Sequence, residues 1–397
     1  MNWKRTLWIL WACNFAVTAG TSLVIPFLPL YIDKLGIQNI QANERWSGYV
    51  FAAQFVTSVF FQPIWGAFAD KHGRKIMLLR AGLGMGVVTA LMGAVGAVWQ
   101  LLLLRLFNGV FSGFISMAVS LQSSITPKEH SGQALGTLQT GAIAGNLIGP
   151  LIGGVLAEAI GFRAVFFCTG ALLIVASVIV LFFVHEHHQP IARKSNNLKE
   201  EIVQLAPLFS VFAASTFIQV GMMSIEPIVT IYAKTLYTGA HLATIAGLVV
   251  ATSGIANLVG APTLGRLGDR IGQRKVLILA TCAAAVMYVP QALAQNIGVL
   301  LVGRFLLGLF IGGMIPSLNV LVKKKAPPEL QATAFGINSS STFLGNLIGP
   351  LIGSSVAAAY GIRNVFYVTM VVLLANAVMI YFNRKLDAEP SVQSTTA

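Results

Sequence analysis

Residues Gly145 to Gly153 read GNLIGPLIG, and the same nine residues recur unchanged as Gly345 to Gly353. The similarity extends outward, since Gly161-Phe162-Arg163 recurs as Gly361-Ile362-Arg363. The nine-residue repeat is offset by 200 residues. At an offset of 199 residues the first half also matches the second at four pairs: Asp70 with Asp269, Gly73 with Gly272, Arg105 with Arg304, and Gly109 with Gly308. One structural unit is therefore predicted to occur twice in the chain.

The composition of the chain excludes a soluble globular protein. Of its 397 residues, 56% are hydrophobic and 10% are charged, whereas about a quarter of the residues of a soluble domain are charged. Twelve apolar stretches approach the roughly 20 residues that cross a bilayer core. They cover residues 6–32, 47–69, 76–96, 99–122, 132–158, 164–184, 206–233, 243–264, 276–294, 297–321, 331–358 and 364–383. Because these stretches lack strict polar alternation, they predict helices and not a β-barrel.

The distribution of cations predicts the topology. Most of the 26 Lys and Arg fall in loops on one side of the predicted membrane, so both termini and the linker are expected in the cytoplasm. The predicted parts are a six-helix bundle over 1–184, a cytoplasmic linker over 185–205, and a second six-helix bundle with a short tail over 206–397. Two bundles of equal orientation are expected to enclose a central cavity.

Two loops carry a repeated motif of glycines, acids and cations. The first runs from Gly66 to Lys75 and the second from Gly265 to Lys275. This pattern is similar to the loop signature of the major facilitator superfamily. The resemblance implies the major facilitator fold and a conformational latch formed by Gly66, Asp70, Gly73, Arg74, Asp269 and Arg274. An ordinary solvated loop is the alternative interpretation of these residues.

The nine-residue repeat lies in the fifth predicted helix. Glycines four residues apart allow close helix approach, and an internal proline favours a kink. The set Gly145, Gly149, Pro150 and Gly153 resembles a helix-5 motif of antiporters in the superfamily, so its role is either packing or control of antiport. Gly20, Pro26 and Pro29 resemble the helix-1 motif of twelve-helix drug:proton antiporters, and the segment around Ser22 to Tyr31 is most similar to the MdtG-like multidrug-efflux branch.

Arg105 lies inside the fourth predicted span. A charged residue there costs about 2.5 to 3.5 kcal/mol unless it faces protein or water, and Asn108 shares its helix face. The resemblance implies proton coupling for Arg105, and a structural hydrogen bond between helices is the alternative. Arg304, its repeat counterpart, is followed by apolar residues and is expected to be structural.

Glu226 is the one carboxylate well inside a predicted span. It shares a face of the seventh helix with Gln219 and Met223, which predicts a cavity wall. Burial disfavours its ionised form, so Glu226 is a candidate for proton exchange or for binding a cationic substrate. A structural contact with a polar neighbour is the alternative.

Other functional classes find little support in the sequence. An ATP-driven pump requires a phosphate-binding motif that is absent, and neither a nucleophile with a base nor a metal cluster is evident among the predicted spans. No enzyme activity, cofactor or metal is therefore expected. The cations are dispersed over loops, which argues against binding of nucleic acid.

Together with these residues, the resemblance implies a bacterial plasma-membrane protein that exports lipophilic, often cationic drugs in exchange for protons by alternating access. Such a multidrug exporter would confer antibiotic resistance. The expected partners are the substrate, protons and the lipid bilayer, with the protein acting as a monomer. The alternative function is a facilitator or exporter of one specific metabolite, such as a sugar.

Overall fold

The computed structural model describes residues 3–127, 130–186, 205–326 and 330–383. Within these segments the secondary structure is helical, without strands. The first bundle contains α1 (Trp3–Leu23), η1 (Ile25–Phe27), α2 (Leu28–Lys34), α3 (Ile40–His72), α4 (Arg74–Met92), α5 (Val98–Phe111), α6 (Phe114–Ile125), α7 (Ser131–Ile160) and α8 (Phe162–Phe183). The second contains η3 (Ala206–Leu208), α10 (Phe209–Leu236), α11 (Leu242–Ile271), α12 (Gln273–Val286), α13 (Tyr288–Ala292), α14 (Ile297–Lys325), α15 (Gln331–Tyr360) and α16 (Ile362–Phe382).

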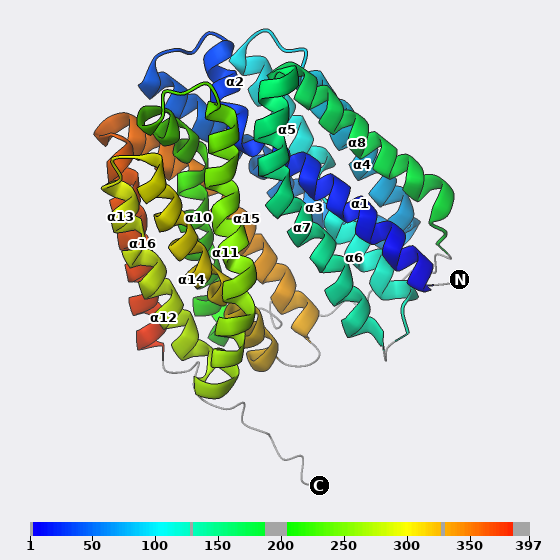
Figure 1. Cartoon of the computed structure of the whole chain (residues 1–397). Helices are drawn as coiled ribbons and strands as arrows, with labels where there is room; N and C mark the ends of the chain where they lie inside the picture. The colour runs from blue at the N-terminus through cyan, green and yellow to red at the C-terminus, as the bar shows by residue number, and fades with distance from the viewer. Residues whose placement is uncertain (1–2, 128–129, 187–204, 327–329, 384–397) are drawn as a thin grey trace.

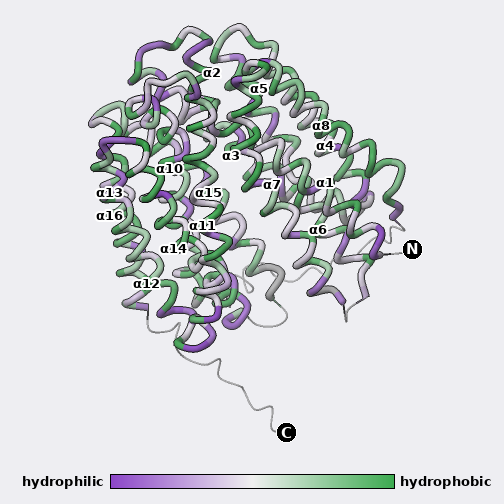
Figure 2. The backbone as a smooth tube through the Cα atoms, in the orientation of Figure 1, coloured by the Kyte–Doolittle hydropathy of each residue, from purple (hydrophilic) through white to green (hydrophobic). Residues whose placement is uncertain are grey.

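The helices have the length and composition of membrane spans. Among the described residues, 11 helical segments are long and apolar enough to cross a bilayer. The remaining long helix, α3, has 33 residues and completes the predicted set of spans, although its ends carry more charge. Figure 2 shows hydrophobic residues along the middle of the helices and hydrophilic residues gathered near their ends. The prediction of an all-helical membrane fold with two six-helix bundles is confirmed.

Three predicted spans are broken in their interior. The stretch 6–32 is interrupted by the short helix η1, which has Pro26 in its first turn. The stretch 99–122 breaks between α5 and α6, where Gly113 has φ +114°, a conformation that favours glycine. The stretch 276–294 divides into α12 and α13, and Pro290 supplies no N–H for the carbonyl four residues earlier. Apolar length predicted these spans but not their internal breaks.

The glycines of the nine-residue repeat bring helix backbones together in both bundles. A Cβ at Gly149 would meet Ala19 of α1, and one at Gly153 would meet the Leu23 carbonyl. In the second bundle a Cβ at Gly353 would meet the Ser224 carbonyl of α10. The same sequence therefore makes the same close helix contact twice, α7 with α1 and α15 with α10.

The two bundles meet at one end of the molecule. We call this the first-loop end, because it carries the loop Leu35–Asn39 after α2; the opposite end, which carries Trp3 and Gly73, is the terminal end. Near the first-loop end α3 packs on α15, α7 packs on α11, and η1 contacts α10 and α11. Figure 1 shows the bundles converging at this end, at the top of the view, and diverging toward the terminal end.

Candidate functional site

A cavity of about 440 Å³ lies between the bundles. Its wall is formed mainly by α1, α3, α4, α5, α6 and α7 of the first bundle, while α10 and α15 contribute from the second. Among the described residues that line it, the acidic and basic side chains are Glu226 and Arg105. Apolar side chains such as Phe51, Phe55 and Phe343 cover much of the remaining wall. The cavity thus combines an apolar surface with one basic and one acidic side chain.

Arg105 is held by a neighbouring helix while it lines this cavity. Its side chain is buried, and its Nη1 donates a hydrogen bond to Gln54 Oε1 of α3 at 2.9 Å. Its Nε is buried and has no hydrogen-bond partner among the described residues. The guanidinium therefore makes an interhelical hydrogen bond and retains a donor that is not used in this state.

The polar wall around Arg105 extends over three helices. Asn108 Nδ2 donates to Thr89 Oγ1 of α4 at 3.1 Å, and the hydroxyls of Ser58 and Ser112 lie 2.8 Å apart. We did not predict the contribution of α3 from the sequence. A signal was present, because Gln54, Ser58 and Gln62 are spaced by four residues in an apolar helix and all line the cavity.

Glu226 lies on α10, one residue before the internal Pro227. It lines the cavity, and its Oε2 is buried without a hydrogen-bond partner among the described residues. The carboxyl interacts electrostatically with Arg304 of α14. Arg304 is itself buried, and its Nε donates to the Val249 carbonyl at 3.3 Å. The carboxyl of Glu226 thus lines the cavity and is within electrostatic range of a buried cation of its own bundle.

The other two candidates on α10 differ in position. Met223 lines the cavity beside Glu226. Gln219, one turn away, donates from Nε2 to Asn346 Oδ1 of α15 and is not among the residues that line the cavity wall. The nearby Ser215 donates to Asn338 Oδ1 of the same helix at 2.6 Å. Gln219 therefore belongs to a polar seam between α10 and α15.

The break in the fourth span lies next to the cavity. Its free carbonyls accept hydrogen bonds from the guanidinium of Arg80, which contacts the carbonyls of Val110, Phe111 and Ser112 at 3.1 to 3.4 Å. The Arg80 guanidinium also lies over the Trp65 ring, at 4.0 Å from its centroid. Arg80 thereby satisfies backbone groups that a continuous helix would bond internally.

The predicted latch residues lie at the terminal end. Gly73 and Gly272 join successive helices with φ near +100°, and Asp269 Oδ1 accepts a hydrogen bond from Gln273 at 3.0 Å. Arg274 donates to the carbonyls of Ile380 and Tyr381 at the end of α16. These contacts join helices of one bundle. Gly66 lies within α3, and the side chain of Asp70 lies outside the described residues.

The carboxylate of Glu186, which we did not predict as a site residue, binds the first motif loop. The backbone N–H groups of Arg74 and Lys75 donate to Glu186 Oε1 and Oε2, at 3.0 and 2.8 Å. These N–H groups begin α4, and a carboxylate is favourable at a helix N-terminus. The position of Glu186 just after a predicted span, among histidines, gives no specific signal for this contact.

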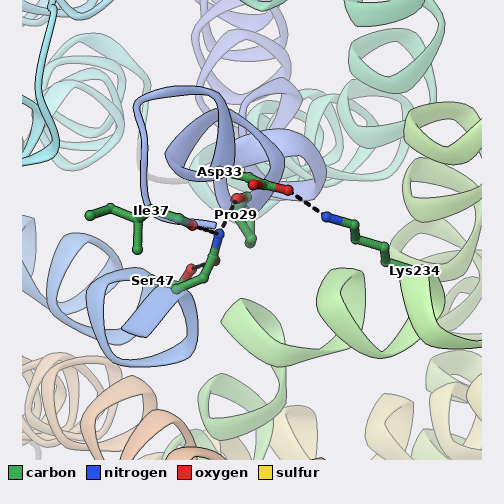
Figure 3. Close-up of polar contacts among 6 residues, drawn as sticks. Pro29, Asp33, Ile37, Ser47 and Lys234 are labelled. Atoms are coloured by element: carbon green, nitrogen blue, oxygen red, sulfur yellow. Dashed lines mark hydrogen bonds and ion pairs between the residues drawn. The ribbon is translucent and has the colours of Figure 1, made fainter. Parts of the chain in front are cut away.

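Polar contacts join the two bundles at the first-loop end. Asp33 of α2 forms an ion pair with Lys234 of α10, and Figure 3 shows these two side chains pointing toward each other across the interface. Beside them Asn43 donates to the carbonyls of Pro29 and Ile37 at 3.1 and 3.2 Å and thereby holds the first loop. Further along α10, Thr230 donates to the Pro26 carbonyl at 2.8 Å.

A second set of contacts joins α7 to the start of α11. The carboxylate of Glu158 accepts hydrogen bonds from the backbone and side chain of Thr244. It also lies 3.1 Å from Nδ1 of His241. The first-loop end is therefore closed by polar contacts on two sides of the interface.

The chain has extensive similarity to known proteins. A family model described as Major Facilitator Superfamily matches residues 10–245 and 211–396. Multidrug resistance protein MdtG of Enterobacter lignolyticus is 43% identical over 383 residues, which cover 95% of this chain and 92% of that protein. The protein of the same name from Yersinia enterocolitica is 41% identical over 391 residues, covering 96% of this chain and 94% of that protein.

Solved structures show the same fold at low identity. A bacterial homologue of the human lysosomal transporter Spinster, in an inward-facing and occupied conformation, has a TM-score of 0.80 at 15% identity and covers 95% of this chain and 96% of its own. The nucleoside transporter NupG has a TM-score of 0.77 at 14% identity, over 96% of this chain and 98% of its own.

Proposed function

Because the chain belongs to the major facilitator superfamily, we propose that it exports lipophilic, often cationic drugs in exchange for protons by alternating access. The similarity to multidrug resistance proteins over nearly the whole chain supports the drug class. The same relatives support placement in the cytoplasmic membrane of a bacterium, and the excess of cations at the terminal end favours cytoplasmic termini.

The observation that carries this proposal is the position of Glu226. A carboxyl that lines the cavity and has one oxygen without a hydrogen-bond partner in the described part of the chain can gain or lose a proton as its surroundings change. When ionised, it attracts a cationic group of a substrate; when protonated, it does not. Proton binding and substrate binding at one carboxyl are then mutually exclusive, which is the requirement for exchange.

Arg105 is proposed to complete the coupling. Its guanidinium lies on the first-bundle wall of the cavity, opposite in charge to Glu226. A fixed cation in the same cavity favours the ionised form of a nearby carboxyl, so movement of the bundles changes how strongly Glu226 holds its proton. Asn108 and Met223 are proposed to contact substrate, the second through its adaptable thioether. Gln219 is proposed to position Glu226 through the seam with α15.

The conformational cycle follows from the contacts between bundles. Closure at the first-loop end corresponds to a state open to the cytoplasm, if the terminal end is cytoplasmic as proposed. The opposite state requires the first-loop contacts to separate and the terminal ends to approach each other.

The latch residues Asp269 and Arg274, with the rest of both motifs, are proposed to change partners in that step. The glycines and Pro150 of α7 keep the first-bundle wall rigid during it. The working unit in the bilayer is proposed to be a monomer.

The test is transport in proteoliposomes that contain the purified full-length protein. Efflux of a fluorescent lipophilic cation is measured with and without an imposed pH gradient, for the wild type, Glu226→Gln and Glu226→Asp. We expect gradient-driven flux in the wild type, its loss in Glu226→Gln, and partial retention in Glu226→Asp, which keeps the carboxyl. Flux that ignores the gradient would contradict proton coupling. Saturable flux of one narrow metabolite class, with none of the cation, would contradict drug export.

A further inference from the structure

Glu44 is a buried carboxylate that the mechanism above does not use. It lies near the start of α3 and is only 2% exposed. Its Oε2 is buried and has no hydrogen-bond partner among the described residues. A buried carboxylate is normally paired or hydrogen-bonded, because removing an unpaired charge from bulk water is costly. The position of Glu44 therefore requires an explanation.

The burial of Glu44 depends on contact between the two bundles. Its side chain lines a cavity of about 730 Å³ formed by α3 of the first bundle and α10, α15 and α16 of the second. One turn further along α3, a Cβ at Gly48 would meet the side chain of Ser354 and the Pro350 carbonyl of α15. The helices are thus in direct contact beside Glu44. Separation of the bundles at the first-loop end would remove one wall of this cavity and expose the carboxyl to bulk water.

The groups that face Glu44 from the second bundle offer it little compensation. The titratable or charged residues that share its cavity are Tyr232 of α10, Tyr360 of α15 and Arg363 of α16. Arg363 interacts with the Tyr232 hydroxyl, and Tyr232 itself donates to the Ala294 carbonyl at 3.1 Å. The other ionisable groups that bridge the bundles at this end, Asp33 with Lys234 and Glu158 with His241, are already engaged with each other.

We infer that Glu44 is a second proton-binding site, occupied when the first-loop end is closed and vacated when that end opens. A proton removes the cost of burying the charge, whereas the hydrated carboxyl of the open state carries its charge freely. Closing the first-loop end then takes up one proton from the compartment on that side. Acid on that side shifts the protein toward the closed state.

This inference adds a step to the proposed function. It rests on that proposal for one point, that the first-loop end faces the outside of the cell. An exporter that has released its drug outside must close its outer end before it can bind again. A proton taken up by Glu44 favours this return step without occupying the drug cavity. The outer acidity would thus act at two carboxyls, Glu226 in the cavity and Glu44 at the first-loop end.

The test measures the conformation directly. Spin labels are attached to cysteines introduced at Gln38 and Thr238, which are exposed on opposite bundles at the first-loop end, with the native Cys13, Cys168 and Cys282 replaced by alanine. All proteins carry Glu226→Gln, so that the cavity carboxyl cannot contribute. The distance distribution gives the ratio of closed to open molecules in lipid nanodiscs at several pH values. Because no transport is measured, the result is independent of whether Glu226 couples export to protons.

With Glu44 present, we expect the ratio of closed to open molecules to rise as the pH falls, by at most about tenfold per pH unit for one bound proton. Glu44→Gln mimics the protonated side chain, so it should remain mostly closed at every pH. Glu44→Ala should likewise lose the pH dependence, and it replaces Glu44→Gln if that variant does not fold. His241→Gln and Asp33→Asn serve as controls that retain Glu44, and both should keep the pH dependence.

Two results would overturn the inference. An unchanged pH dependence in both Glu44 variants would place the titrating group elsewhere. A first-loop end that opens in Glu44→Gln, together with the same opening in Arg363→Gln, would mean that an ionised Glu44 pairs with Arg363 in the closed state. The sign of the Glu44→Gln effect therefore separates a bound proton from an ion pair.

Discussion

The carboxylate of Glu158, at the end of α7 in the first bundle, binds Thr244 in the first turn of α11 in the second. Glu158 Oε1 accepts a hydrogen bond from the Thr244 backbone N–H at 2.8 Å, and Oε2 accepts one from its hydroxyl at 2.7 Å. A carboxylate at this position satisfies a free N–H of the helix and is favoured by the helix dipole. One bundle thus provides the N-terminal cap for a helix of the other.

Removing this cap should weaken the closed first-loop end. In Glu158→Gln the side chain loses its charge, and a charge at a helix N-terminus contributes about 0.3 to 1 kcal/mol, or roughly a two- to fivefold change in the closed-to-open ratio. The distance distribution between labels at Gln38 and Thr238 reports this ratio. Thr244→Ser is the control, because it keeps both hydrogen-bond donors and should leave the distance distribution unchanged. If the closed state is as stable in Glu158→Gln as in the wild type, the cap does not hold the interface.

The pair formed by Asp33 and Lys234 should contribute less. Both side chains are partly exposed, at 26% and 51%, and such pairs are typically worth about 0 to 1 kcal/mol. Asp33→Lys should increase the rate at which a membrane-impermeant maleimide, added outside cells, modifies a cysteine introduced at Asn146 in the cavity. The exchanged variant with Asp33→Lys and Lys234→Asp should restore the slow rate. Failure of the exchange to restore it would show that the pair does not hold the interface.

Substitutions can distinguish the charge of Arg105 from its hydrogen bond to Gln54. Arg105→Lys keeps the positive charge but cannot reproduce the guanidinium geometry, so we expect gradient-driven export to fall at least about tenfold, the scale of one lost charge-assisted hydrogen bond. Gln54→Met removes only the partner of Arg105. If export falls equally in both variants, the hydrogen bond between α3 and α5 is the whole role of Arg105. We expect the smaller loss in Gln54→Met, with pH dependence retained.

The glycine contacts predict a clear effect on stability. In Gly153→Ala the new methyl group would overlap the Leu23 carbonyl, and forced overpacking of this kind costs about 1 to 3 kcal/mol. Thermal unfolding of the purified protein in detergent should show the loss. Gly136→Ala is the matched control, because it lies in the same helix with nothing within 4 Å of the new methyl group. That variant should be neutral or more stable, by up to about 1 kcal/mol; equal melting temperatures for the two variants would contradict the packing role.

The sequence was sufficient to predict the two bundles and the spans, because apolar length and the internal repeat are properties of the chain itself. It also placed Arg105, Asn108, Met223 and Glu226 on helix faces that line one cavity in the structure. Their roles in coupling and binding stay predictions. The seam that engages Gln219 could not be inferred, since helix periodicity gives a direction but not the neighbour found there.

The sequence does not predict the contacts between helices that are distant in the chain. Glu158 is 86 residues from Thr244, and Asp33 is 201 residues from Lys234, so no local pattern relates them. The break at Gly113 was also missed, because glycine within an apolar stretch is compatible with a continuous helix. What decides the break is the three-dimensional setting, in which Arg80 bonds the freed carbonyls.

That break makes the duplicated halves unequal at the cavity. The fourth span of the first bundle is divided into α5 and α6, whereas its counterpart α14 is continuous. The first bundle also supplies nearly all of the cavity wall; the second contributes Met223, Glu226 and Phe343. The halves therefore differ at the cavity: the first bundle provides most of its wall, and the second provides its one acidic side chain, Glu226. Under the proposed function, substitutions confined to the first half would change which compounds the wall accepts, while Glu226 and Arg304 of the second half stay as they are.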